Sequence, residues 1–224
     1  MTWKRRHLLA APAVAWAQGR RIFREISASL YAWDLADEGA EAVLDTLKSV
    51  ARVNSVYLVG LMHHERRPLT GIYFPHNPKR LNYLPEDSRA YWLPDASAYG
   101  RIKPMATQFP DFRGTDWLAT LAKHARARGM RVGAEISHTV MDKERARGEF
   151  RDTIQRDIWG NRLGQLICHN HPDARHYVVS LFRELAARYA LDYVQTCLLP
   201  FAMARLPMQA GQRGENTFEF GFWG

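Results

Sequence analysis

Ser55-Val56-Tyr57-Leu58-Val59-Gly60-Leu61 is a nearly continuous apolar run. Such a run is typical of a strand that is buried on both faces of a parallel sheet. Helical and strand patterns alternate on either side of it. We expect further strands at 25–33, 130–136 and 191–199, and helices that begin at Asp37, Thr115 and Pro172, the second of them ending at Gly129. The chain therefore reads as strand, helix, strand, helix, strand, helix, strand.

This order predicts parallel strands joined by right-handed crossovers, with helices packed outside. An open doubly wound sheet and a (β/α)8 barrel both satisfy it. The glycine-rich turn of a dinucleotide fold does not follow the first strand, where Trp33-Asp34-Leu35-Ala36 stands instead. We therefore expect an α/β fold of the partial (β/α)8 (TIM-type) kind, with about four of the eight units. Half a barrel leaves open sheet edges, so we expect either a fragment or pairing with another half.

The N-terminus has the three regions of a bacterial export signal. Arg5-Arg6 is followed by a short, Ala-rich apolar run and by Ala15-Trp16-Ala17, a small-x-small triplet. Residues 1–17 are therefore predicted to be a twin-arginine signal peptide, with the twin-arginine translocation machinery as partner and a periplasmic or secreted location. The run is shorter than the ~20 residues of a membrane-spanning helix, so no stable membrane span is expected.

Composition narrows the classes of function. The formal charge is +8, and it falls to +5 without the first 17 residues, which carry Lys4, Arg5 and Arg6 but no acidic residue. The other basic residues are spread over helix faces, which favours solvated surface over a nucleic-acid partner. Cys168 and Cys197 are too few for a disulfide framework or a thiolate metal cluster; they can pair in an oxidising compartment or remain free thiols.

A long connection, residues 62–113, separates the second strand from the second helix. It holds seven of the eleven prolines and many aromatic residues, including Tyr73 and Trp92. Aromatic side chains need to be buried or to stack on something, which argues against disorder. In a barrel this loop lies over the face that carries active sites. We expect a lid in which some rings pack together and others stack on a ligand.

The third strand supplies the candidate catalytic residues. If Val132, Ala134 and Ile136 face the helices, Glu135 faces the interior, and His138 follows just beyond the strand. A carboxylate beside a histidine can act as an acid/base pair, hold a sugar hydroxyl or bind a metal. A buried glutamate satisfied by its strand neighbours is an equal alternative.

Other candidates stand on the loops that follow the strands. Trp33 and Asp34 follow the first strand as a stacking and hydroxyl-binding pair, although helix capping by Asp34 is an adequate alternative. Gln195, on the last strand, can bind substrate but cannot be an acid or a nucleophile. The candidate substrate-binding residues are Trp33, Asp34, His63, Tyr73, Trp92, Asn170 and Gln195. Loop histidines show no His-x-x-x-His spacing, so we expect neither a metal nor a cofactor.

Residues 128–138, with the sequence RGMRVGAEISH, resemble the third-strand region of amylase-type glycoside hydrolase barrels. Residues 168–175 and 192–195 and the stretch 73–80 are similar to uncharacterised exported bacterial glycoside-hydrolase-like proteins. The resemblance covers residues 24–201 and implies the N-terminal half of such a barrel, with 202–224 as an irregular or truncated tail. It also implies a catalytic carboxylate at the end of the fourth strand, where this sequence has Gln195.

Three hypotheses follow for function. The first is a glycoside-hydrolase-like protein that binds and hydrolyses a carbohydrate at the carboxyl face of the barrel, using Glu135 and His138. Glycoside hydrolysis requires two carboxylates, and the sequence nominates one. The second is a metal-dependent barrel hydrolase or isomerase that uses Glu135, His138 and a loop histidine such as His171. The third is a carbohydrate-binding module without catalysis.

Overall fold

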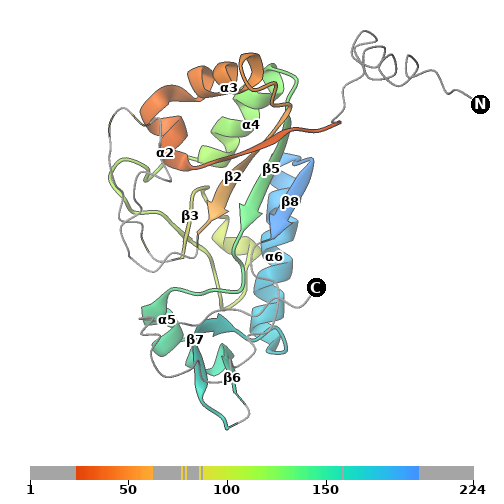
Figure 1. Cartoon of the computed structure of the whole chain (residues 1–224). Helices are drawn as coiled ribbons and strands as arrows, with labels where there is room; N and C mark the ends of the chain where they lie inside the picture. Colours follow the sequence, from red (N-terminus) through yellow and green to blue (C-terminus); the bar gives the residue numbers. More distant parts are fainter. Residues whose placement is uncertain are drawn as a thin grey trace, which may run out of the picture.

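Parallel strands follow one another across one sheet in the order of the sequence (Figure 1). The structure is a computed structural model that describes residues 24–62, 77, 79, 86, 88–157 and 159–196. β1 (Ser27–Leu30) pairs with β2 (Ser55–Leu61), β2 pairs with β5 (Arg131–Ile136), and β5 pairs with β8 (Tyr193–Thr196), all in parallel. Each strand therefore lies beside the one before it, and the winding never reverses as it does in a doubly wound sheet.

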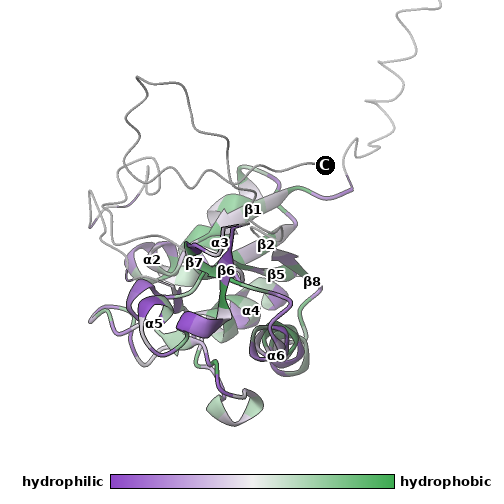
Figure 2. Ribbon diagram, turned by 90° about the horizontal axis from the view of Figure 1, so that it is seen from below, coloured by the Kyte–Doolittle hydropathy of each residue, from purple (hydrophilic) through white to green (hydrophobic). Residues whose placement is uncertain are grey.

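The helices between these strands all cover the same face of the sheet. They are α3 (Ala40–Ser49), α4 (Trp117–Ala127) and α6 (Pro172–Tyr189). Figure 2 shows them on one side of the strands, and no described helix covers the opposite side. Helices on one face are the arrangement of a (β/α) barrel wall. The described strands form an open arc of this kind and do not close into a barrel.

The core lies between this sheet and its helices. Val56, Leu58, Val132, Ala134 and Ile136 have none of their surface exposed, because alternate residues of each strand point into the helix layer. The next residues along the strands point to the other side, the inner face. We define the inner face by Tyr57, Gly133, Glu135, Tyr193 and Gln195, which occupy matching register positions on β2, β5 and β8.

Several predicted boundaries agree with the structure, and others are wrong. β2 has the predicted limits, Pro172 is the first residue of α6, and Gly129 follows α4 with a left-handed φ of 67°. The first strand is shorter than predicted because α2 (Ala32–Asp34) and the π-helix η1 (Leu35–Gly39) follow it at once. Asp37 does not cap α3: it accepts a hydrogen bond from Asn77 Nδ2 at 2.6 Å. The cap of α4 is Asp116, one residue after the predicted Thr115.

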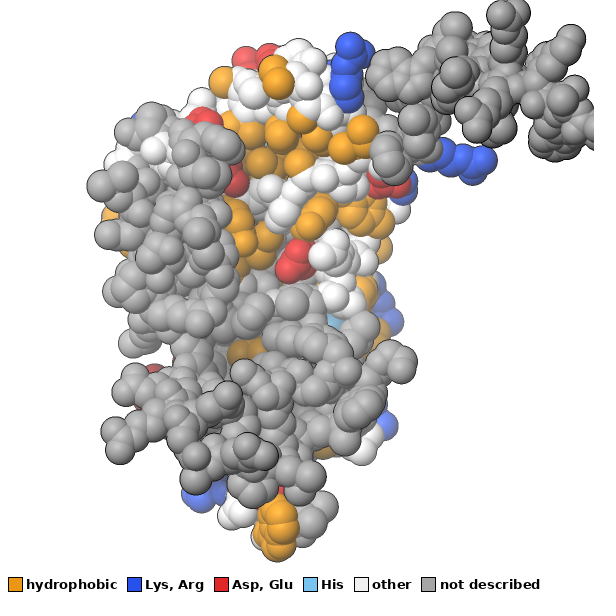
Figure 3. All heavy atoms as spheres, viewed as in Figure 1, with side chains coloured by type: hydrophobic (Ala, Val, Ile, Leu, Met, Phe, Trp, Pro, Cys, Tyr) orange, Lys and Arg blue, Asp and Glu red, His pale blue; other side chains and the backbone are white. Residues whose placement is uncertain are grey.

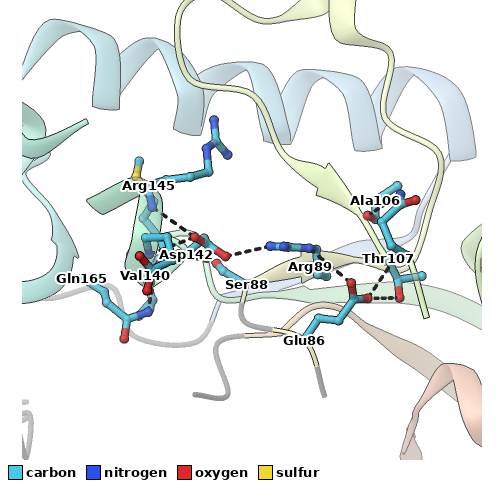
Figure 4. A network of polar contacts seen from close by, with 12 residues as sticks. Glu86, Ser88, Arg89, Ala106, Thr107, Val140, Asp142, Arg145 and Gln165 are labelled. Carbon is cyan, nitrogen blue, oxygen red and sulfur yellow. Dashed lines mark hydrogen bonds and ion pairs between the residues drawn. The ribbon is translucent and has the colours of Figure 1, made fainter. Parts of the chain in front are cut away.

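The described part of the long connection packs into the molecule. It forms β3 (Arg89–Ala90), η3 (Ala96–Ala98) and β4 (Met105–Ala106), and β3 pairs with the end of β2. Figure 4 shows how charged residues hold it: Glu86 accepts from Thr107 Oγ1 at 2.6 Å, and Arg89 Nη1 lies 3.0 Å from Asp142 Oδ2. The connection is therefore tied to the segment that follows β5.

That following segment is an insertion that sequence patterns did not predict. It contains α5 (Lys143–Arg147), η4 (Arg151–Thr153) and an antiparallel hairpin of β6 (Ile154–Arg156) and β7 (Arg162–Ile167). The hairpin projects from the lower end of the molecule in Figure 1, beyond the carboxyl end of β5. Across the described residues, none of the helices combines the length and apolar character that a membrane crossing would need.

Candidate functional site

The inner face carries a carboxylate at the carboxyl end of the sheet. Glu135 on β5 and Gln195 on β8 are register partners, and Gln195 Nε2 donates to Glu135 Oε2 at 3.1 Å. Residues 60 positions apart in the sequence thus meet because their strands are neighbours. Figure 3 views this face: apolar and uncharged side chains surround an acidic patch in the middle of the described surface.

The environment of Glu135 alters its acidity. Its side chain is half-buried, and burial raises the pKa of its carboxyl group above the ordinary value because the charged form loses solvation. The uncharged amide of Gln195 donates one hydrogen bond to this carboxylate, and no cation contributes to the change in the pKa of Glu135. A carboxyl group with a raised pKa keeps its proton to a higher pH than an ordinary carboxyl group does, and the protonated state is the one a general acid needs.

Two tyrosines lie on the same inner face, on either side of Gly133, two residues before Glu135 along β5. The rings of Tyr57 and Tyr193 lie 6.3 Å apart, edge to face, and Tyr193 Oη is 2.7 Å from Ser55 Oγ. Gly133 lies between them in the register, and a Cβ added there would overlap the Tyr193 ring. A glycine at this position therefore lets the ring lie flat across β5. Sequence reasoning did not select these tyrosines, although Tyr193 shares strand parity with Gln195.

The structure does not pair Glu135 with His138. His138 is fully buried, and its ring stacks on His169 with centroids 5.6 Å apart and meets Phe182 of α6 at 5.9 Å. Neither of its nitrogens has a hydrogen-bond partner by distance and angle. Burial, and then the neighbouring His169, lower the pKa of His138 to about 4. His138 is therefore a neutral, enclosed imidazole, and the expected acid/base pair is not formed.

Trp33 and Trp92 are not ligand-stacking surfaces, which corrects the expectation for both. Trp33 has no exposed surface, because it stacks on Tyr31 at 4.3 Å and packs against the rings of Tyr91 and Phe112. Trp92 is 1% exposed. The described part of the long connection folds back against α2 and α4, and its buried rings, Tyr91, Trp92, Tyr99 and Phe112, fill the core instead of forming a surface.

A buried glutamate explains why Trp92 is fixed there. Glu184 on α6 is 4% exposed and accepts hydrogen bonds from Trp92 Nε1 at 3.4 Å and from the backbone N–H of Asp95 at 2.7 Å. It also accepts from the hydroxyl of Tyr99 and pairs with Arg188. The donors surround a charge that would otherwise be costly to bury. Glu184 therefore anchors the long connection to α6.

The remaining candidates are dispersed. Asp34 Oδ2 accepts from the backbone N–H of Tyr31 at 2.8 Å, which is the capping alternative rather than a ligand contact. Asn170 is exposed in the turn before α6. His63 and Tyr73 lie outside the described residues.

Metal ligands are not assembled in the described part of the chain. No group of three His, Cys, Asp or Glu side chains there is placed to hold an ion. His171 caps α6 instead, because its Nδ1 accepts from the backbone N–H of Asp173 at 3.2 Å. Cys168 is a free thiol, and Cys197 lies outside the described residues. The export signal at 1–17 lies outside them as well.

Comparison with known proteins gives resemblance in solved structures alone. No family model matches the sequence, and no curated protein matches it. The maltogenic α-amylase AmyB from Thermotoga neapolitana is 15% identical, with a TM-score of 0.45 over 79% of this chain and 39% of that one. A pullulanase from Paenibacillus barengoltzii, solved with maltohexaose and α-cyclodextrin, is 13% identical, with a TM-score of 0.48 over 82% of this chain and 32% of that one. This chain thus spans less than two fifths of either protein's length, and its fold is established by its own strand order.

Proposed function

We propose that the inner face binds a carbohydrate at the carboxyl end of the sheet, and that Glu135 is the group that acts on the bound sugar. The observation that carries this proposal is the half-buried Glu135, with its raised pKa, among Tyr57, Tyr193 and Gln195. Tyrosine rings offer apolar faces, and amide and carboxylate groups bind hydroxyls. Polar groups converging on an aromatic surface are typical of a small-molecule site.

The role of Glu135 in the proposed reaction is that of general acid. Its raised pKa suits donation of a proton to a glycosidic oxygen as the bond breaks. Hydrolysis requires a second carboxylate, and Gln195 occupies the position where the resembled family has one. Cleavage therefore requires a second carboxylate that is not among the residues that define the inner face. Binding of a sugar does not require this second carboxylate.

The test is the substitution Glu135→Gln, which keeps the shape and removes the ionisable group. We expect it to lower the rate of cleavage of any α-glucan or other glycan that the wild-type protein cleaves by about a hundredfold or more, and to remove the alkaline limb from the pH–rate profile of the activity that remains. Glu149→Gln, at an exposed position, is the matched control. Unchanged turnover in Glu135→Gln would refute the catalytic role.

The second candidate is a binding module without catalysis, favoured by Gln195 at the expected carboxylate position. Calorimetric titration with maltooligosaccharides separates the two. Heat of binding without release of reducing sugar supports the hypothesis of a binding module, provided that Tyr193→Ala weakens the binding. If neither binding nor turnover is found with a panel of neutral glycans, the carbohydrate assignment is wrong.

We also propose that residues 1–17 direct export by the twin-arginine route. Fusing them to a reporter that folds before export tests this. Periplasmic reporter should appear with the Arg5-Arg6 pair and disappear when both residues are changed to lysine. Export that persists in the double-lysine variant would contradict the proposal.

A further inference from the structure

The tip of the β6–β7 hairpin exposes a single tryptophan on an ordered turn. Trp159 is 75% exposed, in contrast to the buried Trp33 and Trp92. Figure 3 shows hydrophobic atoms at this lower tip of the molecule. None of the described aromatic rings or guanidinium groups lies against the indole. Its faces are therefore available to a partner.

Hydrogen bonds hold this turn in one shape. Asp157 Oδ1 accepts from the backbone N–H groups of Trp159 at 2.9 Å and Asn161 at 2.8 Å, and Asp157 Oδ2 accepts from Asn161 Nδ2 at 2.9 Å. Gly160 closes the turn with a left-handed φ of 87°. A ring presented by an ordered turn loses little conformational entropy on binding. The sequence around Trp159 is thus suited to display it.

Three arginines lie close to this turn. Arg156 and Arg162 are cross-strand partners, and Arg151 lies beside them, since the Arg162 side chain donates to its carbonyl oxygen at 3.0 Å. Arg156 Nη1 donates to the carbonyl oxygen of Gly160 at 3.1 Å, which brings a positive charge next to the tryptophan. None of the three forms an ion pair with any described residue. Burial, and then repulsion from Arg151 and Arg156, lower the pKa of Arg162.

We propose that Trp159 and these arginines form a binding surface for an anionic polysaccharide. The indole would stack on the C–H face of a sugar ring, and a neighbouring guanidinium would hold its carboxylate or sulfate through paired N–H donors. Charge complementarity supports this partner, because three unpaired cations meet few acids here. Asp152 pairs with Arg101 at 2.7 Å, and the carboxylate of the turn, Asp157, offsets only one of the three arginine charges.

Other partners fit the surface less well. A single strand of nucleic acid is held in a groove by several stacked rings, whereas this convex tip shows one exposed ring among the described residues. A bilayer requires an apolar surround, whereas Asp157 and Asn161 flank the tryptophan. The proposal does not depend on Glu135, so the two sites can fail separately.

The test is affinity electrophoresis of the full chain through gels with polygalacturonate, dextran sulfate or neutral dextran. We expect stronger retardation by an anionic polymer than by dextran, because dextran, a neutral α-glucan, can bind only at the inner face. The two anionic gels distinguish carboxylate from sulfate. Trp159→Ala should weaken binding about tenfold, and Trp159→Phe less. Arg151→Gln, whose side chain makes no described hydrogen bond, should weaken it about two- to fivefold.

Controls separate this surface from general charge and from folding. Val179→Ala and Arg175→Gln, at exposed positions of α6, should bind like wild type. Acrylamide quenching of fluorescence reports whether Trp159 is covered. The proposal is overturned if Trp159→Ala binds as wild type does, if dextran binds equally, or if an oligothymidylate or vesicles containing phosphatidylglycerol bind more tightly than either anionic polysaccharide.

Discussion

Acidification should destabilise this protein through His138, and the size of the effect follows from its burial. The imidazole is fully buried between His169 and Phe182, and neither nitrogen has a hydrogen-bond partner by distance and angle. Protonation in this position places an unsolvated charge in the core. The unfolded chain accepts the same proton in water without that cost. The unfolded state therefore binds the proton more readily than the folded state.

The sign and the pH window follow from the two pKa values. The folded pKa is about 4 and the ordinary value is 6.5, so the stabilisation is complete above pH 6.5 and is lost as pH falls toward 4. The difference corresponds to about 3 kcal/mol at most. His169, whose pKa burial also lowers, contributes in the same direction. Both effects strengthen the folded state near neutral pH.

Urea unfolding of wild type and His138→Phe, at intervals between pH 7.5 and 4, measures the effect. Phenylalanine preserves the stacked ring but cannot take up a proton. As the pH falls across this range, the free energy of unfolding of the wild type should decrease by about 2 to 3 kcal/mol more than that of His138→Phe. Carboxylates titrate alike in both proteins and cancel. Parallel stability curves for the two proteins would refute the reasoning.

Other substitutions test the packing around the site, each by urea or thermal unfolding. Glu184→Gln should cost about 1 to 3 kcal/mol, because donors around a buried carboxylate lose a charged acceptor; a change below about 0.5 kcal/mol would show that the anchor is dispensable. Gly133→Ala should cost about 1 to 3 kcal/mol through overlap with Tyr193, and the cost should shrink in a Tyr193→Ala background. Arg89→Met removes the ion-pair partner of the buried Asp142 and should lower the free energy of unfolding by about 2 kcal/mol or more. An unchanged free energy of unfolding would mean that the backbone N–H groups that donate to Asp142 are sufficient to stabilise its carboxylate.

Local sequence patterns were sufficient for the four parallel strands β1, β2, β5 and β8, but not for the short β3 and β4. In any parallel α/β fold, an apolar run such as that of β2 indicates a buried strand, and a proline such as that at the start of α6 indicates the beginning of a helix. Both patterns are reliable because burial and the missing N–H group of proline act locally. Strand parity likewise placed Glu135 opposite the helix-facing side. The hairpin of β6 and β7 was missed, although Asp157 and Gly160 are turn residues between short alternating segments.

The placement of aromatic and histidine side chains could not be read from the sequence. Trp33, Trp92 and His138 were assigned to a ligand face because each follows or covers a strand end. Their burial depends on how residues 88–113 fold against α2 and α4, and on Glu184, which is 92 residues from Trp92. Contacts over such separations leave no periodic signal, since each partner is set by the path of the whole chain.

The sequence by itself determined the order of strands and helices and the side of the sheet on which Glu135 lies, because alternation and helical periodicity are properties of neighbouring residues. Only the tertiary structure decided that Gln195 is its partner, that His138 is enclosed by α6, and that Trp159 remains exposed while other tryptophans are buried. Those outcomes depend on the register between distant strands and on the volume left inside the core, which no local pattern encodes.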